Sequence, residues 1–178
     1  MCEPGMSPAA EPREREYALD ESDGLHAEIM RLVKSRLGDR TEEYAFPPPV
    51  FTDMCGEFVS LDLDAQSLVV RFPVYERYLN PYGSMQGGTL TAAVDNTIGP
   101  LSMLVAPPNV TRRLETIYSR PATPDMESIE VRARLAERKD RWLFFKADVC
   151  SREGVRIARA SSTHFIVDGW DTGGEEDA

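Results

Sequence analysis

One carboxylate stands alone in a long uncharged stretch of the sequence. Asp95 is the only formally charged residue between Arg77 and Arg112, and its neighbours are small or apolar. A run of this kind is typical of a buried helix, in which an ionisable group is costly unless it is paired or used. Burial raises the pKa of a carboxyl group and so prepares it to take a proton from water. The stretch therefore points to a chemical site around Asp95, with a structural carboxylate that caps a neighbouring loop as the alternative.

A glycine pair precedes this carboxylate. Gly87 and Gly88 lie where the apolar helix should begin, so their backbone N–H groups lack an intrahelical acceptor at the positive end of the helix dipole. A residue without a Cβ also lets a substrate approach the backbone closely. The pair is suited to bind a developing oxyanion. Close packing of the helix is the alternative reason for two glycines.

Composition limits the class of protein. The chain has 178 residues, 42% of them hydrophobic, which is enough for one domain with a core. Its net charge is −10 and its pI about 4.7, so it lacks the basic footprint that nucleic acid requires of its main partners. The acidic residues concentrate at the two ends, whereas residues 112–159 are rich in arginine and leave room for a local anion site.

Cysteine usage and the apolar runs indicate the compartment. Cys2, Cys55 and Cys150 are odd in number and far apart, which favours free thiols in a reducing cytosol over disulfides or a metal site. The N-terminal residues lack the apolar segment of a signal peptide. The longest apolar run, 85–106, is interrupted by a charge and a proline, so no membrane insertion is expected. We expect a cytoplasmic protein without a bound metal.

Hydrophobic periodicity defines the expected elements. Helical spacing covers residues 22–37, and the apolar helix covers 86–105, with a kink or break expected at Pro100. Period-two alternation indicates strands, the first with Val59, Leu61 and Leu63 on one face. Further strands are expected at 68–74, 111–120, 129–135, 143–149 and 155–167. The order predicts an α+β fold, an antiparallel sheet wrapped around one central buried helix.

The same pattern sets the boundaries of the domain. Residues 1–19, rich in Pro, Glu and Arg, and the acidic residues 169–178 are expected to be flexible tails. Residues 20–40 hold an N-terminal amphipathic helix, which we expect to pack on a single domain at 50–168.

The element order and the loop-helix stretch resemble the hotdog fold and, more narrowly, the phenylacetate-type (PaaI-like) acyl-CoA thioesterases. That family carries an Asn, a Gly, a His-Gly-Gly triplet and an acidic residue eight positions beyond the first glycine of the pair. Asn80, Gly83, the triplet Gln86-Gly87-Gly88 and Asp95 stand at those spacings. The strand that ends in TIYSRPA also fits, so the resemblance covers residues 55–167. Gln86 replaces the family's His, and its amide cannot transfer a proton but can hydrogen-bond a carbonyl or a helix end.

The resemblance implies an activity, the hydrolysis of an acyl-CoA to a free acid and CoA, with no cofactor beyond the CoA of the substrate. Asp95 would be the general base, or alternatively the nucleophile, and Gly87 N–H the oxyanion donor. Asn80 would orient water or substrate, and the Thr111 hydroxyl would help to hold the water. The remaining expected contacts are Gln86 to a carbonyl, Gly88 in the turn, Tyr82 and Met85 in an acyl pocket, and Arg112 and Arg113 to the CoA phosphates. The two histidines, His26 and His164, receive no role.

The spacing of the two central groups predicts self-association. Gly87 and Asp95 are eight residues apart, which is about 12 Å along a helix. One thioester carbonyl and one water do not comfortably span that distance, so groups that act in one site should come from different subunits. Since the family forms dimers with interfacial sites, we expect a homodimer, with a dimer of dimers as an extension.

Two other functions remain open. A non-catalytic hotdog module that binds an acyl-CoA or a related ligand is the alternative, because Gln86 stands where the family has His. A hotdog hydratase or dehydratase would pair a His with an acidic residue, and the absence of any His between His26 and His164 counts against it.

Overall fold

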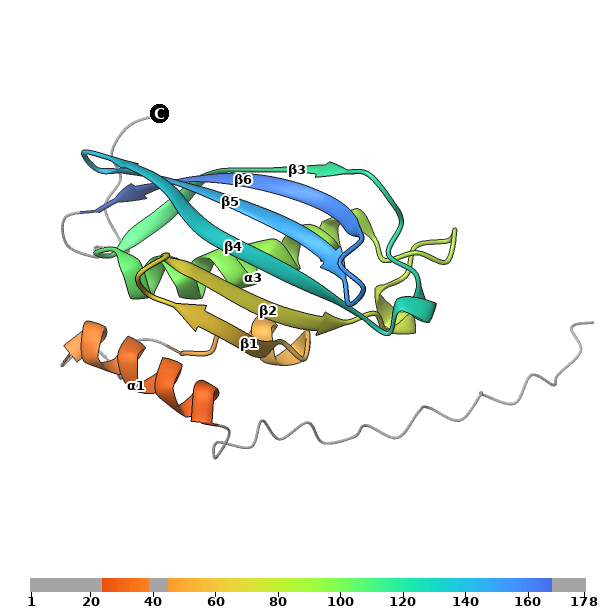
Figure 1. The fold of residues 1–178 in the computed structure, drawn as a ribbon, viewed down its shortest axis with the longest axis horizontal. Helices are drawn as coiled ribbons and strands as arrows, with labels where there is room; N and C mark the ends of the chain where they lie inside the picture. Colours follow the sequence, from red (N-terminus) through yellow and green to blue (C-terminus); the bar gives the residue numbers. More distant parts are fainter. Residues whose placement is uncertain (1–23, 39–44, 168–178) are drawn as a thin grey trace, which may run out of the picture.

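The computed structural model describes residues 24–38 and 45–167. The tails expected at 1–19 and 169–178 lie outside these residues. One antiparallel sheet has the strand order β1-β2-β4-β5-β6-β3 and curves around the long helix α3, as Figure 1 shows. The predicted α+β architecture is therefore confirmed. The strands are β1 (Glu57–Asp62), β2 (Ser67–Pro73), β3 (Asn109–Tyr118), β4 (Ser128–Lys139), β5 (Trp142–Ser151) and β6 (Arg156–Ile166), and the helices are α1 (Gly24–Leu37), α2 (Pro49–Asp53) and α3 (Gly87–Val105).

The apolar helix α3 is the centre of the core. Leu90, Val94, Ile98 and Leu101 recur at helical spacing and are buried where α3 packs against β2, β4 and β5. The break expected at Pro100 does not occur, because α3 continues through this buried proline to Val105. Packing of the apolar face offsets the local cost of a helix-interior proline, about 3 kcal/mol.

The first strand differs from its predicted pattern. The register shifts between Phe58 and Ser60, which marks a β-bulge. An extra residue exchanges the two faces of a strand. As a result Phe58 is the buried residue of β1, and Leu63, expected on a face with Val59, lies after the strand and is exposed.

A short helix that the periodicity did not predict closes the core beside β1. The α2 residue Phe51 is fully buried, with its ring centroid 4.8 Å from that of Phe58 and 6.0 Å from that of Phe72. A Cβ at Gly56 would come within 2.9 Å of both the Phe51 and the Phe72 rings, so only glycine fits there. The amphipathic helix α1 buries Ile29 and Val33 and contacts α3 and β1.

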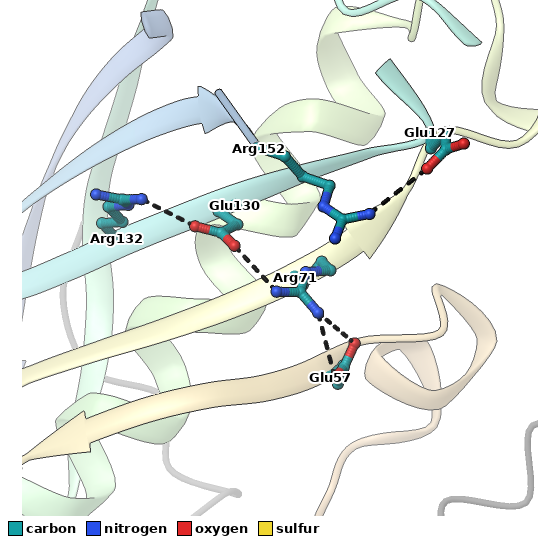
Figure 2. Close-up of polar contacts among 6 residues, drawn as sticks. All are labelled: Glu57, Arg71, Glu127, Glu130, Arg132 and Arg152. Carbon is teal, nitrogen blue, oxygen red and sulfur yellow. Dashed lines mark hydrogen bonds and ion pairs between the residues drawn. The ribbon is translucent and has the colours of Figure 1, made fainter. Parts of the chain in front are cut away.

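Ion pairs link the first three strands of the sheet. In Figure 2, Arg71 of β2 lies between two carboxylates, Glu57 of β1 at 3.2 Å and Glu130 of β4 at 3.1 Å. Arg132 pairs with the second oxygen of Glu130 at 3.0 Å. Desolvation pushes the pKa of Glu130 up, but hydrogen bonds from Arg132 and Arg71 outweigh it and leave the pKa below its ordinary value. These ion pairs link β1, β2 and β4 in one register across the sheet.

Candidate active site

The beginning of α3 presents free backbone donors. Gln86 is the N-cap residue in an extended conformation, and the N–H of Leu90 is the first to bond back, to Gln86 O at 3.0 Å. The N–H groups of Gly87, Gly88 and Thr89 therefore precede the first intrahelical bond. Within the described residues no side chain caps this end, so the helix-end alternative for Gln86 finds no support, and its hydrogen bond to a carbonyl stays a prediction.

Tyr118, at the end of β3, lies against this helix start. Its hydroxyl donates to Gly87 O at 2.8 Å and lies 2.6 Å from Thr91 Oγ1, which in turn lies 3.1 Å from Thr116 Oγ1. A Cβ at Gly87 would lie 3.2 Å from the Tyr118 ring, which is a tight contact. Glycine at 87 thus allows the end of β3 to pack against the start of α3. The contact between Gly87 and Tyr118 joins residues 31 positions apart, so the local sequence does not predict it. A Cβ at Gly88 would meet no atom within 4 Å, so packing inside the chain does not explain Gly88.

Asp95 lies on the face of α3 turned away from the sheet. Its neighbours Val94 and Asn96 are buried, but the Asp95 residue is exposed in the single chain, so the prediction of a buried carboxylate is wrong at this level. The helical period is the reason, since a position next to a core position points about 100° away from it. Partial desolvation by surrounding atoms still raises the pKa of Asp95 above its ordinary value. Within the described residues no hydrogen bond or ion pair reaches this carboxylate, so the loop-capping alternative finds no support there.

The side chain of Asn80 is engaged within its own loop. Its Oδ1 accepts from the N–H groups of Tyr82 at 2.9 Å and Ser84 at 3.3 Å, and its Nδ2 donates to Ser84 Oγ at 3.1 Å. These bonds shape the turn that leads into α3, which includes Gly83 at φ 76°. The two nearby residues expected in an acyl pocket differ in burial. Tyr82 is 93% exposed, whereas Met85 is 4% exposed and belongs to the core.

Thr111 is held by a histidine to which the sequence assigned no partner. Thr111 is exposed, and its Oγ1 lies 3.2 Å from Nε2 of His164. His164 is 2% exposed, and its Nδ1 lies 2.7 Å from Oδ1 of Asn109. Desolvation lowers the pKa of His164 to about 4, so the ring is neutral. The three residues meet because β3 pairs with β6 in a register that places Thr111 opposite His164.

The two arginines expected at the CoA phosphates are exposed near the start of β3. Arg113 forms an ion pair with Glu115, which offsets part of its charge. The Arg112 guanidinium lies 5.8 Å from the centroid of the Phe165 ring. In the part of the chain that the structure describes, no group of His, Cys, Asp and Glu side chains is arranged to hold a metal ion, and no helix is long and apolar enough to cross a membrane.

Solved structures resemble this fold over most of the chain. A candidate thioesterase related to phenylacetic acid degradation, from Ralstonia eutropha JMP134, is 26% identical with a TM-score of 0.64, over 76% of this chain and 98% of that chain. The PaaI protein of E. coli, from its phenylacetic acid degradation operon, has the same TM-score at 13% identity, over 79% of this chain and 97% of that chain. The chain has the PaaI-like hotdog fold.

A third hotdog structure contains coenzyme A. It is a hypothetical thioesterase from Streptococcus pneumoniae TIGR4, 20% identical with a TM-score of 0.57, over 63% of this chain and 88% of that chain. Two further structures of a Streptococcus pneumoniae TIGR4 hypothetical thioesterase carry alanine in place of an aspartate and in place of a threonine sixteen positions later. For the protein of this article, no protein-family model matches the sequence, and no match is found among curated proteins.

Proposed function

We propose that the protein hydrolyses acyl-CoA thioesters to a free carboxylic acid and CoA. One observation carries the proposal: the single helix α3 presents an uncapped N-terminus at Gly87 and, farther along, the carboxylate of Asp95 with a raised pKa. A hydrolysis of this kind needs both groups, an oxyanion donor and a base for water. The thioesterase names of the structural neighbours support the reaction class.

The proposed reaction balances with these groups alone. Asp95 accepts a proton from water while the water oxygen attacks the carbonyl carbon of the thioester. The carbonyl electrons move onto oxygen, and Gly87 N–H donates a hydrogen bond to the oxyanion. Collapse of this intermediate breaks the C–S bond, and the bonding pair leaves on the sulfur of CoA. The thiolate takes the proton from Asp95, which restores the carboxylate, so CoA enters only as part of the substrate.

The two groups belong to different copies of the chain in this proposal. Gly87 and Asp95 are about 12 Å apart along α3. The contacts of Thr91 with Thr116 and Tyr118 place the start of α3 beside the end of β3, so Asp95 lies nearer the start of β3, where Thr111 stands. A two-fold axis through β3 would bring the start of one strand to the end of the other. Asp95 and Thr111 of one copy would then face Gly87 of the partner subunit.

The free edge of β3 supports this homodimer. Among the described strands, β3 pairs only with β6, so the backbone groups along its other edge have no strand partner. Such an edge of 10 residues is a template for pairing with another chain. Ile117 and Tyr118 at its end are 47% and 50% exposed, and a second copy would cover them. A dimer of dimers would extend the assembly to a homotetramer.

Thr111 and the arginines complete the proposed site. Asp95 and Thr111 are sixteen positions apart, the spacing of the aspartate and threonine replaced in the Streptococcus pneumoniae structures. We assign Thr111 to the attacking water. Arg112 and Arg113 follow it directly and are exposed, so they would meet the CoA phosphates as charge-assisted donors. Asn80 acts through the shape of its loop, and Gln86 and Gly88 line the entrance to the oxyanion site.

A thiol-release assay across short, long and aromatic acyl-CoAs tests the proposal. We expect hydrolysis in the wild-type protein and a loss of at least about a hundredfold in Asp95→Asn with the fold intact. Asp64→Asn makes the same chemical change at an exposed turn residue and should leave the rate unchanged. Unchanged activity in Asp95→Asn would contradict the mechanism.

The alternative function gives a different result in the same experiment. Gln86 does not titrate, so a module that only binds an acyl-CoA remains compatible with the site. Saturable binding of acyl-CoA without hydrolysis of any thioester would establish that module and overturn the enzyme.

A further inference from the structure

A chain of hydrogen bonds connects the backbone to the Thr111 hydroxyl through two side chains. Asn109 Nδ2 donates to Pro107 O at 2.9 Å, which fixes the orientation of the Asn109 amide. Its Oδ1 is therefore turned to Nδ1 of His164, 2.7 Å away. An amide oxygen only accepts hydrogen bonds, so Nδ1 of His164 must carry the hydrogen.

The tautomer of His164 determines what Thr111 does. The ring is neutral, and with the hydrogen on Nδ1 its Nε2 carries a lone pair. The Thr111 hydroxyl, 3.2 Å from Nε2, is then the donor of that bond. Because a hydroxyl has one hydrogen and two acceptor lone pairs, Thr111 Oγ1 can only accept from any other group. His164 is almost fully buried with its ring centroid 4.9 Å from that of Phe145, so this arrangement is held by packing.

The same three residues could be viewed as nucleophile, base and orienting group, as in Ser-His-Asp or Cys-His-Asn hydrolases. The low pKa of His164 argues against a role as general base. A base with a pKa of about 4 has little driving force to take a proton from a threonine hydroxyl near neutral pH. A buried neutral histidine is suited instead to act as a fixed acceptor.

We propose that Asn109 and His164 are positioning residues that lock the Thr111 hydroxyl as a hydrogen-bond acceptor for the attacking water. The consequence for catalysis rests on the proposed function. A water that gives one hydrogen to Asp95 and the other to Thr111 Oγ1 keeps a lone pair directed at the thioester carbon. A threonine hydroxyl free to rotate would compete as a donor for that lone pair.

Nuclear magnetic resonance of the imidazole nitrogens tests the locked geometry without reference to activity. The chain has two histidines, so a His26→Gln variant assigns the His164 signals. We expect His164 to be protonated at Nδ1 and unprotonated at Nε2, without titration between about pH 5 and pH 8. In Thr111→Val the Nε2 signal should shift because its donor is lost. Protonation at Nε2, or titration within that range, would overturn the inference.

Steady-state kinetics with matched variants tests the positioning role. Asn109→Leu removes the acceptor of Nδ1–H, whereas Asn109→Asp retains one. We expect kcat to fall about tenfold or more in Asn109→Leu and Thr111→Val with KM nearly unchanged, and Asn109→Asp to recover most of the loss. Thr163→Val serves as the control, because it makes the same change as Thr111→Val at a residue of β6 whose side chain lies on the opposite face of the strand from His164.

The outcomes separate this inference from the proposed function. Wild-type kcat in a folded Asn109→Leu protein would overturn the positioning role, even if Asp95→Asn is inactive. If no thioester is hydrolysed at all, the proposed function fails, and the nitrogen signals of His164 still decide whether Thr111 is locked as an acceptor.

Discussion

Gly87 combines a free N–H group with the absence of a side chain, and two substitutions separate these properties. Gly87→Ala adds a Cβ close to the Tyr118 ring but keeps the N–H, whereas Gly87→Pro adds the Cβ and removes the N–H. Proline is tolerated at the first position of a helix, and the extended Gln86 before it, at φ −61° and ψ 136°, is compatible with a following proline.

We expect Gly87→Pro to lower kcat by a further factor of about 10² to 10³ relative to Gly87→Ala, because one oxyanion donor is lost. Thiol-release kinetics on both variants, with thermal unfolding as the check of folding, measures the difference. Equal kcat values in the two variants would remove Gly87 N–H from the mechanism.

Asp95 should leave a signature in the pH dependence of both activity and stability. Desolvation raises its pKa, so the acid limb of kcat/KM should have its inflection above the ordinary value of 3.8. A carboxyl with a raised pKa favours the folded state in its protonated form, and this contribution is lost as pH rises through the folded-state pKa. Asp95→Asn should therefore be at least as stable as the wild type at about pH 7.

Thermal unfolding between about pH 3 and pH 7 checks the sign. The Tm of Asp95→Asn minus that of the wild type should increase with pH. A difference that decreases with pH would mean that the ionised carboxylate stabilises the fold, as the loop-capping alternative requires.

The site residues were predictable from sequence to different degrees. Asp95 stood out because it is the lone charge of its stretch, but its exposure depends on which helical face meets the sheet. His164 carried no signal, since its contacts to Asn109 and Thr111 arise from pairing between strands about 55 residues apart. Asn80 was expected to contact water or substrate, which stays a prediction, and the hydrogen bonds that the structure shows for it close its own loop.

At the scale of the elements, the exposed edge of β3 determines assembly in the proposed dimer. Ile117→Lys places a charge on this edge and, across a two-fold axis, a like charge close by, so we expect a weaker dimer. Val50→Lys on α2 is a matched control, because Val50 and Ile117 are both 47% exposed and β-branched.

Analytical ultracentrifugation and thiol release on the two variants measure the result. Ile117→Lys should shift towards the monomer and lose activity in parallel, while Val50→Lys should do neither. A fully active monomer would contradict a site shared between subunits.

Element types followed from the hydrophobic period, and their details did not. The helix α3 and the strand order along the chain agree with the alternation of apolar residues, because burial of one face dominates their formation. The bulge in β1 and the short helix α2 were not predicted, since one extra residue or a five-residue helix leaves no hydrophobic period to detect. The break that was one of two alternatives at Pro100 does not occur because tertiary packing of α3 outweighs the local cost of the proline.

At the scale of the whole molecule, the proposed site requires a second copy of the chain. The sheet order places β3 at an edge, and α3 carries Gly87 and Asp95, the two groups of the proposed mechanism, at different points along its length. Periodicity and family resemblance predicted this architecture, whereas the strand contacts that orient α3 against β3 came from the structure. Both lines support the proposal of a homodimer with two equivalent sites, each built from two chains.

The most direct test is the activity of a heterodimer of Gly87→Pro and Asp95→Asn chains, isolated with a different affinity tag on each. If each site takes Gly87 from one chain and Asp95 from the other, one of the two sites receives both intact residues. The heterodimer should then show about half of the wild-type activity, although each homodimer is nearly inactive. A heterodimer no more active than the two homodimers would contradict the shared site.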